Sequence, residues 1–451
     1  MSASLHAPIA AISTALQDAA IGVVRLSGEG CHAIALQCFR PAGRPPASQR
    51  ACVGHAFDRS GDIDKVVLTL WKAPRSFTGE DMAEFSCHGG RVVLYDVLAA
   101  LIEAGARQAG PGEFTRRAFL NGKLDLAESE AIIDLITAES RAAARAALSQ
   151  ASGALSRQCA ALRESLIEAD ADIMAYVDFS DEGIAEADPA ALGDALRAAE
   201  EGLDRLLDTC RRGRVVRDGV QTAIIGKPNV GKSSLLNLLA GAERAIVTEI
   251  PGTTRDTVSE TVSVGGLALR LLDTAGLRET DDPVERIGVQ RSRETAEQAQ
   301  LLLAVFDSSQ PWSALDDDVL ALCRDREVIA LLNKCDLPRR LDNSPLKDRV
   351  SCVIPFSTVT GEGLPELERR IGSLYLPAPD EVLLVSLRHS EAAARAREAL
   401  HRARIAIEQG TPPDIAEVDL RTAIAALGEI TGQSVTEDVI ENIFSRFCVG
   451  K

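Results

Sequence analysis

The run Gly226–Ser233 places two glycines, a lysine and a serine at the spacing of a phosphate-binding loop. Its glycines allow several backbone N–H groups to turn toward an anion, and the helix that follows adds the positive end of its dipole. Lys232 would reach the β- and γ-phosphates, and the Ser233 hydroxyl would hold Mg²⁺. An apolar run at 222–225 precedes the loop, and a run of helical composition at 234–239 follows it. Strand, loop and helix therefore occur in the order that nucleotide binding requires.

A second group of polar residues indicates that the base is guanine. The apolar runs 301–306 and 328–332 are typical of buried parallel strands, and the second leads directly into Asn333-Lys334-Cys335-Asp336. The Asp336 carboxylate can accept hydrogen bonds from both the ring N–H and the exocyclic amine of guanine, a pair of donors that adenine does not offer. These residues therefore predict specificity for guanine nucleotides.

Three further segments complete the pattern of a GTPase. Asp273-Thr274-Ala275-Gly276 follows the apolar run 267–272, so its aspartate lies at the ligand-binding edge of a parallel sheet, where it can order the water shell of the metal. Its glycine N–H can sense the γ-phosphate, and Thr254 can complete the Mg²⁺ shell when that phosphate is present. Ser357-Thr358 follows the apolar run 353–356, and a backbone N–H there is expected to meet the guanine oxygen, although GTPases usually carry Ser-Ala at this point.

The residue after the Asp-x-x-Gly segment is Leu277, which cannot orient water as the glutamine of many small GTPases does. The motifs Gly-x-Pro-Asn-x-Gly-Lys-Ser-Ser, Gly-Thr-Thr-Arg-Asp and Asp-Thr-Ala-Gly-Leu-Arg make the chain resemble the MnmE (TrmE) family of tRNA-modification GTPases. The resemblance extends nearly end to end, through Ser76–Asp81, His88–Gly90, Pro111–Thr115, Arg117–Asp125 and Phe447–Lys451.

The resemblance implies a potassium site beside the phosphates, formed by Asn229, Thr248, Thr253 and the backbone carbonyl of Ile250. A cation held by preorganised oxygens would offset charge that develops between the β- and γ-phosphates. The resemblance also implies that Glu285 orients water through an intermediary, so the expected catalytic residues are Glu285, Lys232 and Asn229. The full set expected to contact GTP or GDP is Asn229, Val230, Gly231, Lys232, Ser233, Ser234, Thr248, Glu249, Ile250, Pro251, Gly252, Thr253, Thr254, Asp273, Thr274, Ala275, Gly276, Asn333, Lys334, Asp336, Ser357 and Thr358.

For the N-terminal region, the resemblance implies a module that binds a tetrahydrofolate derivative in its 5,10-methylene or 5-formyl form. The residues that match the family's motifs are Arg25, Glu84, Lys123 and Lys451. Cations can pair with the glutamyl carboxylates of folate, and a carboxylate can accept from the pterin amino group. One segment departs from the family, because Ser13–Ala20 replaces a Pro-Pro-Gly-x-Gly-Gly loop and lacks the glycines that would let backbone approach a ligand.

Composition sets the outer limits. A length of 451 residues suggests roughly three domains, and 46% hydrophobic residues suffice for a large core. The net charge of −17 argues against a protein that wraps RNA unaided, so we expect a basic partner. The resemblance implies the same, because the family works on tRNA with the FAD-containing protein MnmG (GidA). No membrane span or secretory leader is visible and the ten cysteines show no paired spacing, which predicts a reduced cytoplasmic protein.

The expected fold class is α/β plus α: an N-terminal α/β domain and a helical domain interrupted by a GTPase domain with a Ras-like doubly wound sheet. The predicted domains are 1–120, the helical parts 121–215 and 378–451, and the GTPase insertion 216–377. The Ala-rich helices are expected to form a globular bundle rather than a coiled coil, because strict heptads are not sustained. The N-terminal domain is expected to mediate a homodimer.

The resulting hypothesis is a K⁺-stimulated GTPase that helps to modify the wobble uridine of certain tRNAs at C5. A carboxymethylaminomethyl or aminomethyl group would be built there from a folate one-carbon unit. Two alternatives remain open. A ribosome-assembly GTPase would carry a basic RNA-binding appendage, which the sequence does not show, and a GTP-sensing scaffold would leave tRNA nucleosides unchanged when the protein is lost.

Overall fold

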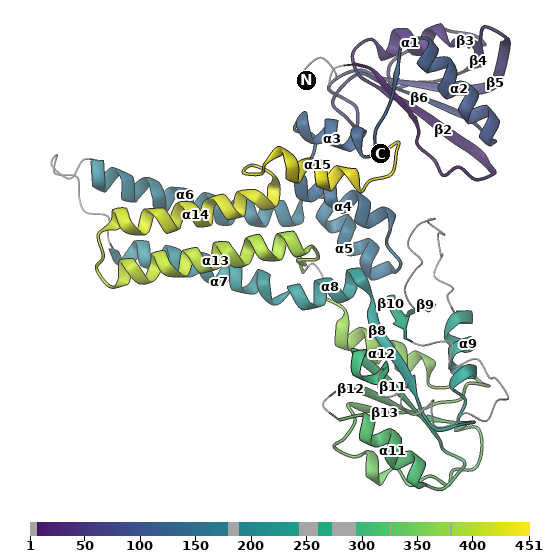
Figure 1. Cartoon of the computed structure of the whole chain (residues 1–451), viewed down its shortest axis with the longest axis vertical. Helices are drawn as coiled ribbons and strands as arrows, with labels where there is room; N and C mark the ends of the chain where they lie inside the picture. The colour runs from purple at the N-terminus through teal and green to yellow at the C-terminus, as the bar shows by residue number, and fades with distance from the viewer. Residues whose placement is uncertain (1–6, 179–188, 243–259, 273–294, 325, 379–380) are drawn as a thin grey trace. The chain divides into compact units, whose positions relative to one another are not determined.

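The computed structural model describes residues 7–178, 189–242, 260–272, 295–324, 326–378 and 381–451 (Figure 1). The described residues form two compact units. Unit 1 comprises residues up to 133 together with 156–163 and 424–451, and unit 2 comprises 134–155 and 164–423. Within the described residues, no helix is both long enough and apolar enough to cross a membrane.

A seven-stranded sheet forms the core of unit 1, in the order β3-β4-β5-β6-β2-β1-β7. The runs 21–26 and 65–70, which are rich in β-branched residues, lie in β2 and β5. Alternate residues of the strands face two clusters: one packs against α1 and α2, and a smaller one contains Phe114 of α3. The elements are β1 (Ile9–Ile12), β2 (Ala19–Ser27), α1 (Cys31–Gln37), β3 (Phe39–Pro41), β4 (Ala51–Asp58), β5 (Gly61–Trp71), β6 (Met82–Gly89), α2 (Arg91–Glu103), β7 (Arg107–Gln108) and α3 (Glu113–Leu120).

The residues at the far end of the sequence pack against this sheet. Helix α15 (Glu437–Ser445) joins α3 through a cluster that contains Phe119, Phe444 and Phe447. Beyond it, the Phe114 N–H donates to the Lys451 carbonyl at 3.2 Å, and the Ser13 hydroxyl donates to the Gly450 carbonyl at 3.0 Å. The segment 448–451 therefore lies beside the loop that departs from the family pattern.

Long helices occupy the segments whose composition predicts them. Helices α7 and α13 lie side by side in Figure 1 and are joined by Glu200, which accepts from Arg404 at 2.7 Å and His401 at 2.8 Å. The helical segment that begins at residue 189 is interrupted at Thr209, whose hydroxyl accepts from the Leu384 N–H at 3.0 Å. The helices are α4 (Leu126–Ile136), α5 (Arg141–Ala151), α6 (Ala154–Asp178), α7 (Pro189–Asp208), α8 (Cys210–Asp218), α13 (Leu387–Glu408) and α14 (Pro413–Thr431).

Unit 2 also contains a six-stranded sheet in the order β13-β12-β11-β8-β10-β9, parallel except where β9 pairs with β10. Successive residues of β11 enter two different cores, one with α9 and α12 and the other with α11, so helices cover both faces. The expected doubly wound fold class is confirmed. The elements are β8 (Val220–Ile225), α9 (Lys232–Ala242), β9 (Glu260–Val264), β10 (Leu267–Leu271), β11 (Leu301–Asp307), α11 (Ala314–Leu322), β12 (Glu327–Asn333), β13 (Cys352–Pro355) and α12 (Leu364–Tyr375).

Candidate nucleotide site and N-terminal cavity

The predicted phosphate loop connects the end of β8 to the start of α9. A Cβ atom on Gly226 would lie 2.6 Å from the Val305 carbonyl oxygen, and one on Gly231 would lie 2.2 Å from Nδ2 of Asn333. Gly231 also has φ +102°, a conformation that side chains rarely adopt. Both glycines are therefore required by close approach to the neighbouring strands β11 and β12.

Lys232 is the first residue of α9 and turns back over the loop. Its Nζ donates to the carbonyls of Gly226 at 2.8 Å and Lys227 at 2.9 Å. Burial lowers the pKa of Lys232, because the charged ammonium is partly removed from water. A bound triphosphate would restore the preference for the charged form, so this lysine is prepared for an anion.

Asn333 connects the phosphate loop to the segment that follows β13. Its side-chain Nδ2 donates to the Val230 carbonyl at 2.6 Å, and its Oδ1 accepts from the Thr358 N–H at 3.1 Å. The side chain is almost fully buried. Sequence analysis predicts a base-contacting role for Asn333, and the structure shows that it also joins two other parts of the site.

Lys334 makes a second connection, because its Nζ donates to the Asn229 carbonyl at 3.0 Å and to Asp307 at 2.7 Å. Burial would raise the pKa of Asp307, but hydrogen bonds from Lys334 and Ser309 outweigh it and hold that pKa below its ordinary value. Sequence reasoning missed Asp307, although an acid at the carboxyl end of a fully buried strand was a usable signal. Asp336 is exposed and therefore accessible to a base.

The other predicted nucleotide contacts divide into two groups. Ser233 and Ser234 lie in the first turn of α9, and Ser357 is buried while its hydroxyl accepts from the Thr360 N–H at 3.2 Å. The remainder fall outside the described residues, and these are Thr248, Glu249, Ile250, Pro251, Gly252, Thr253, Thr254, Asp273, Thr274, Ala275, Gly276 and Glu285.

A cavity of about 420 Å³ opens in the N-terminal sheet domain. Two of the predicted residues, Glu84 and Lys123, line it, and Lys123 also donates to the Pro74 carbonyl at 3.3 Å. Arg25 pairs with Glu84 at 2.7 Å across neighbouring strands β2 and β6. The remaining lining residues, which sequence reasoning did not predict, are Gln49, Trp71, Arg75, Ser76, Phe77 and Met82.

Aromatic rings hold Arg25 in place. Its guanidinium lies 5.5 Å from the ring centroid of Phe77 and 5.7 Å from that of Phe114. The fourth predicted residue, Lys451, belongs to the same neighbourhood. Burial lowers its pKa, the charge of Arg25 lowers it further, and Glu84 opposes both. The structure thus brings together residues that are widely separated in the sequence.

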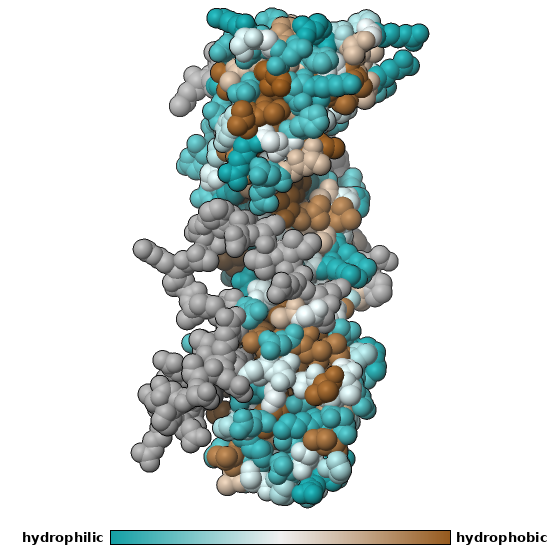
Figure 2. All heavy atoms as spheres, turned by 90° about the vertical axis from the view of Figure 1, so that its right-hand side faces the viewer, coloured by the Kyte–Doolittle hydropathy of each residue, from teal (hydrophilic) through white to brown (hydrophobic). Residues whose placement is uncertain are grey.

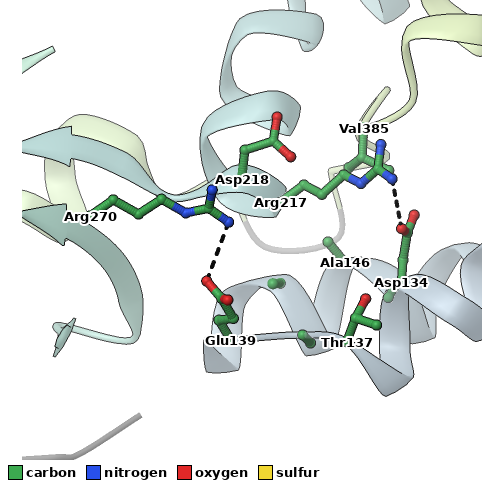
Figure 3. Close-up of a pocket in the computed structure, with 11 residues that line it drawn as sticks. Asp134, Thr137, Glu139, Ala146, Arg217, Asp218, Arg270 and Val385 are labelled. Atoms are coloured by element: carbon green, nitrogen blue, oxygen red, sulfur yellow. Dashed lines mark hydrogen bonds and ion pairs between the residues drawn. The ribbon is translucent and has the colours of Figure 1, made fainter. Parts of the chain in front are cut away.

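Another cavity, of about 250 Å³, lies in unit 2 between the α4–α5 turn, α8 and β10 (Figure 3). Two ion pairs border it, Arg217 with Asp134 at 3.0 Å and Arg270 with Glu139 at 3.4 Å. Asp218 also lines it. No sequence motif predicted this cavity, because its charged groups come from separate segments.

A parallel sheet with a glycine-lined phosphate loop, a lysine held over that loop and an Asn-Lys-x-Asp segment on a neighbouring strand defines the class of P-loop GTPases. Comparison with known proteins narrows the class. The sequence model for the "MnmE helical domain" matches residues 126–448, and that for the "GTP-binding protein TrmE N-terminus" matches residues 8–123.

Similar proteins named tRNA modification GTPase MnmE match almost the whole chain. The one from Heliobacterium modesticaldum is 44% identical over 461 residues, that from Geobacillus kaustophilus 42% over 456, and that from Alkaliphilus oremlandii 40% over 455. Each match covers 98% of this chain and 99% of the relative. The chain belongs to the MnmE family of tRNA modification GTPases, and it is therefore a GTP-hydrolysing enzyme.

Proposed function

We propose that this chain is a K⁺-stimulated GTPase that works with a FAD-containing partner of the MnmG (GidA) type. Together they would modify the wobble uridine of certain tRNAs at C5, adding a carboxymethylaminomethyl or aminomethyl group. The observation that carries the proposal is that one chain contains both a connected guanine-nucleotide site and a separate cavity suited to folate. The domain limits 1–120, 121–215, 216–377 and 378–451 remain part of the proposal.

The nucleotide site would hold two metal ions. Ser233 and Thr254 would bind Mg²⁺, and Asn229, Thr248, Ile250 and Thr253 would bind K⁺. Among these, Ser233 and Asn229 are described: Ser233 opens α9, and Asn229 is exposed on the phosphate loop at φ +62°. Both offer the oxygen atoms that hard cations prefer. K⁺ would supply positive charge beside the phosphates, Lys232 would contact the β- and γ-phosphates, and Glu285 would orient water.

The N-terminal cavity fits a tetrahydrofolate derivative, as the 5,10-methylene or 5-formyl compound. Its volume lies in the range of small-molecule pockets, and its wall combines aromatic rings with a few polar groups. Glu84 would accept from the pterin amino group, and Lys123 and Lys451 would pair with carboxylates. Arg25 would hold Glu84 in place. The folate derivative would supply the one-carbon unit.

A homodimer formed through the N-terminal domain is supported by exposed hydrophobic side chains. Ile21 of β2 is 64% exposed, and Val92 and Tyr95 of α2 are 72% and 53% exposed. Hydrophobic atoms also gather on the N-terminal domain at the top of Figure 2. The net charge of −17 favours a partner that supplies basic surface for tRNA, and a cytoplasmic location suits that partnership.

Mass spectrometry of tRNA nucleosides from a deletion strain, with and without the restored gene, tests the tRNA role. We expect the C5 modification of the wobble uridine to disappear and to return with the gene. Unchanged nucleosides would favour the scaffold alternative instead. Equal GTP turnover in K⁺ and Na⁺ would remove the K⁺ site while leaving the tRNA role intact.

A further inference from the structure

We propose that Asp316 is a positioning residue for GTP hydrolysis, acting through Lys227 on the carbonyl that holds Lys232. Neither Lys227 nor Asp316 belongs to the predicted set of nucleotide contacts. This role rests on the proposed GTP site at the loop 226–233, because the contact between Lys227 and Asp316 would set the geometry of that site.

The contact joins the phosphate loop to the start of α11. Lys227 Nζ lies 2.7 Å from Asp316 Oδ2 and also donates to the Ser313 hydroxyl at 3.3 Å. The same Oδ2 accepts from the Ser313 N–H at 2.9 Å and from its hydroxyl at 2.6 Å. Asp316 is 1% exposed, so the lysine meets a buried carboxylate that is already fixed to the helix end.

The charge balance around Asp316 makes this pairing necessary. Oδ1 of Asp316 is buried and has no hydrogen-bond partner among the described residues. A buried carboxylate satisfied on one oxygen alone is costly unless a cation accompanies it. Lys227 lies next to it as that cation, so the loop cannot shift away from α11 without leaving a buried charge unpaired.

Lys227 transmits this restraint to Lys232. Its side chain is tied to α11, while its backbone carbonyl accepts from Lys232 Nζ at 2.9 Å. The loop has a glycine before Lys227 and another before Lys232, and glycines leave the backbone conformationally free. The ion pair between Lys227 and Asp316 restrains this part of the loop against α11. Displacements as small as 1 Å at a reacting group can lower rates by about 100-fold.

A purely structural role, as the cap of α11, predicts a different pattern. Asn at position 316 could still accept from the Ser313 N–H, so Asp316→Asn preserves the cap but removes the charge. Asp317 is a matched control, because it lies in the same first turn and, in the part of the chain that the structure describes, accepts no hydrogen bond from Lys227. Instead it accepts from Trp312 Nε1 at 2.9 Å.

The experiment measures kcat, KM and the Kd of a fluorescent GTP analogue for the full-length wild type and for five variants. These are Asp316→Asn, Lys227→Met, their double variant, Lys227→Arg and Asp317→Asn. We expect Asp316→Asn and Lys227→Met each to lower kcat by about 10- to 100-fold, with smaller changes in KM and Kd. The double variant should be no worse than either single variant, and Lys227→Arg should recover most of the rate.

Activity of Asp316→Asn equal to that of Asp317→Asn would overturn the positioning role, as would multiplicative losses in the double variant. If Asp316→Asn fails to fold, as judged by circular dichroism, the comparison of folded Lys227→Met with Lys227→Arg decides, because both leave the helix cap in place and only Met removes the charge. A wild type that binds no GTP analogue would instead refute the proposed nucleotide site itself.

Discussion

The nucleotide site and the neighbourhood of Arg25 and Glu84 beside the N-terminal cavity each contain a half-buried lysine whose pKa is lowered, but the two lysines are held differently. Lys232 is held by two backbone carbonyls within one short loop. Lys451 lies near the opposed charges of Arg25 and Glu84, which come from strands far away in the sequence. Lys232 is held by the backbone of its own loop, whereas the surroundings of Lys451 are assembled only when distant segments meet.

The two sites should therefore be sensitive to different substitutions. The nucleotide site depends on the loop 226–233 and on the contacts that hold it, from Asn333, Lys334 and Asp316. The N-terminal cavity depends on side chains from several separate elements. A substitution in one site should leave the other site unchanged.

The largest effect is expected for Lys232→Ala. Removing the ammonium that contacts the phosphates should lower GTP turnover by about 100- to 1,000-fold, the cost of one transition-state donor. Folate affinity, measured by calorimetry on the same sample, should stay within about twofold because the cavity belongs to another sheet. A parallel loss of folate binding would show that the two sites are not independent.

Asp336→Asn should weaken GTP binding by about 10- to 100-fold, because each charge-assisted hydrogen bond to the base is worth about 1.5–3 kcal/mol. Binding of xanthosine triphosphate should improve, since an amide can donate to the additional oxygen of that base. Asp318→Asn, on the exposed side of α11, is the control and should leave both affinities unchanged. A variant that discriminates bases as the wild type does would remove Asp336 from the base site.

Arg25→Gln should lower folate affinity by about 10-fold and destabilise the protein by about 1–3 kcal/mol, because Glu84 loses its charged donor. GTP turnover should remain within about twofold. Arg40→Gln is a matched control, since Arg40 also pairs with an acid, Asp62, and lies over an aromatic ring, but at an exposed position. Exposed ion pairs contribute about 0–1 kcal/mol to stability. Thermal unfolding and folate-binding measurements should therefore show a larger loss for Arg25→Gln than for Arg40→Gln.

The smallest effect concerns pH. Because burial and Arg25 lower the pKa of Lys451 from 10.5, the folded protein binds fewer protons than the unfolded chain between the lowered value and 10.5. The free energy of unfolding should therefore increase as the pH rises through that window. Below the window, the buried charge of Lys451 should lower the free energy of unfolding by a constant amount. Chemical denaturation of Lys451→Met between pH 7 and 10.5 should lack this rise. Parallel curves for wild type and variant would contradict the assignment.

The sequence alone predicts a nucleotide site because the residues expected there lie in contiguous motifs. The residues of the loop 226–233 and of the segment 333–336 each follow a recognisable motif within a few positions. The apolar runs that precede these segments are β8 and β12. The residues expected to contact folate follow from the family resemblance rather than from spacing, because residues such as Arg25 and Lys451 share no local pattern. Their proximity depends on strand pairing and on the packing of α15, which no short window of sequence encodes.

Other features could not be predicted for the same reason. Asp307 and Asp316 each pair with a lysine that is distant in the sequence. The sequence alone therefore does not identify their partners. The break at Thr209 depends on the Leu384 N–H from a distant segment, which overrides a continuous helical pattern. Local sequence patterns thus predict secondary structure and motifs. The contacts that hold the motifs in place are tertiary, and no local pattern predicts them.

The hydrogen bond from Ser13 to Gly450 spans 437 positions of the chain. At translation rates of about 5–20 residues per second, roughly 20–90 s separate the synthesis of its two partners. During that interval a ribosome-bound chain has already synthesised the strands around the phosphate loop, while Ser13 and the start of α3 still lack their hydrogen bonds to residues 448–451. Nascent chains should therefore form the nucleotide site before the N-terminal residues gain their contacts with the residues at the far end of the sequence.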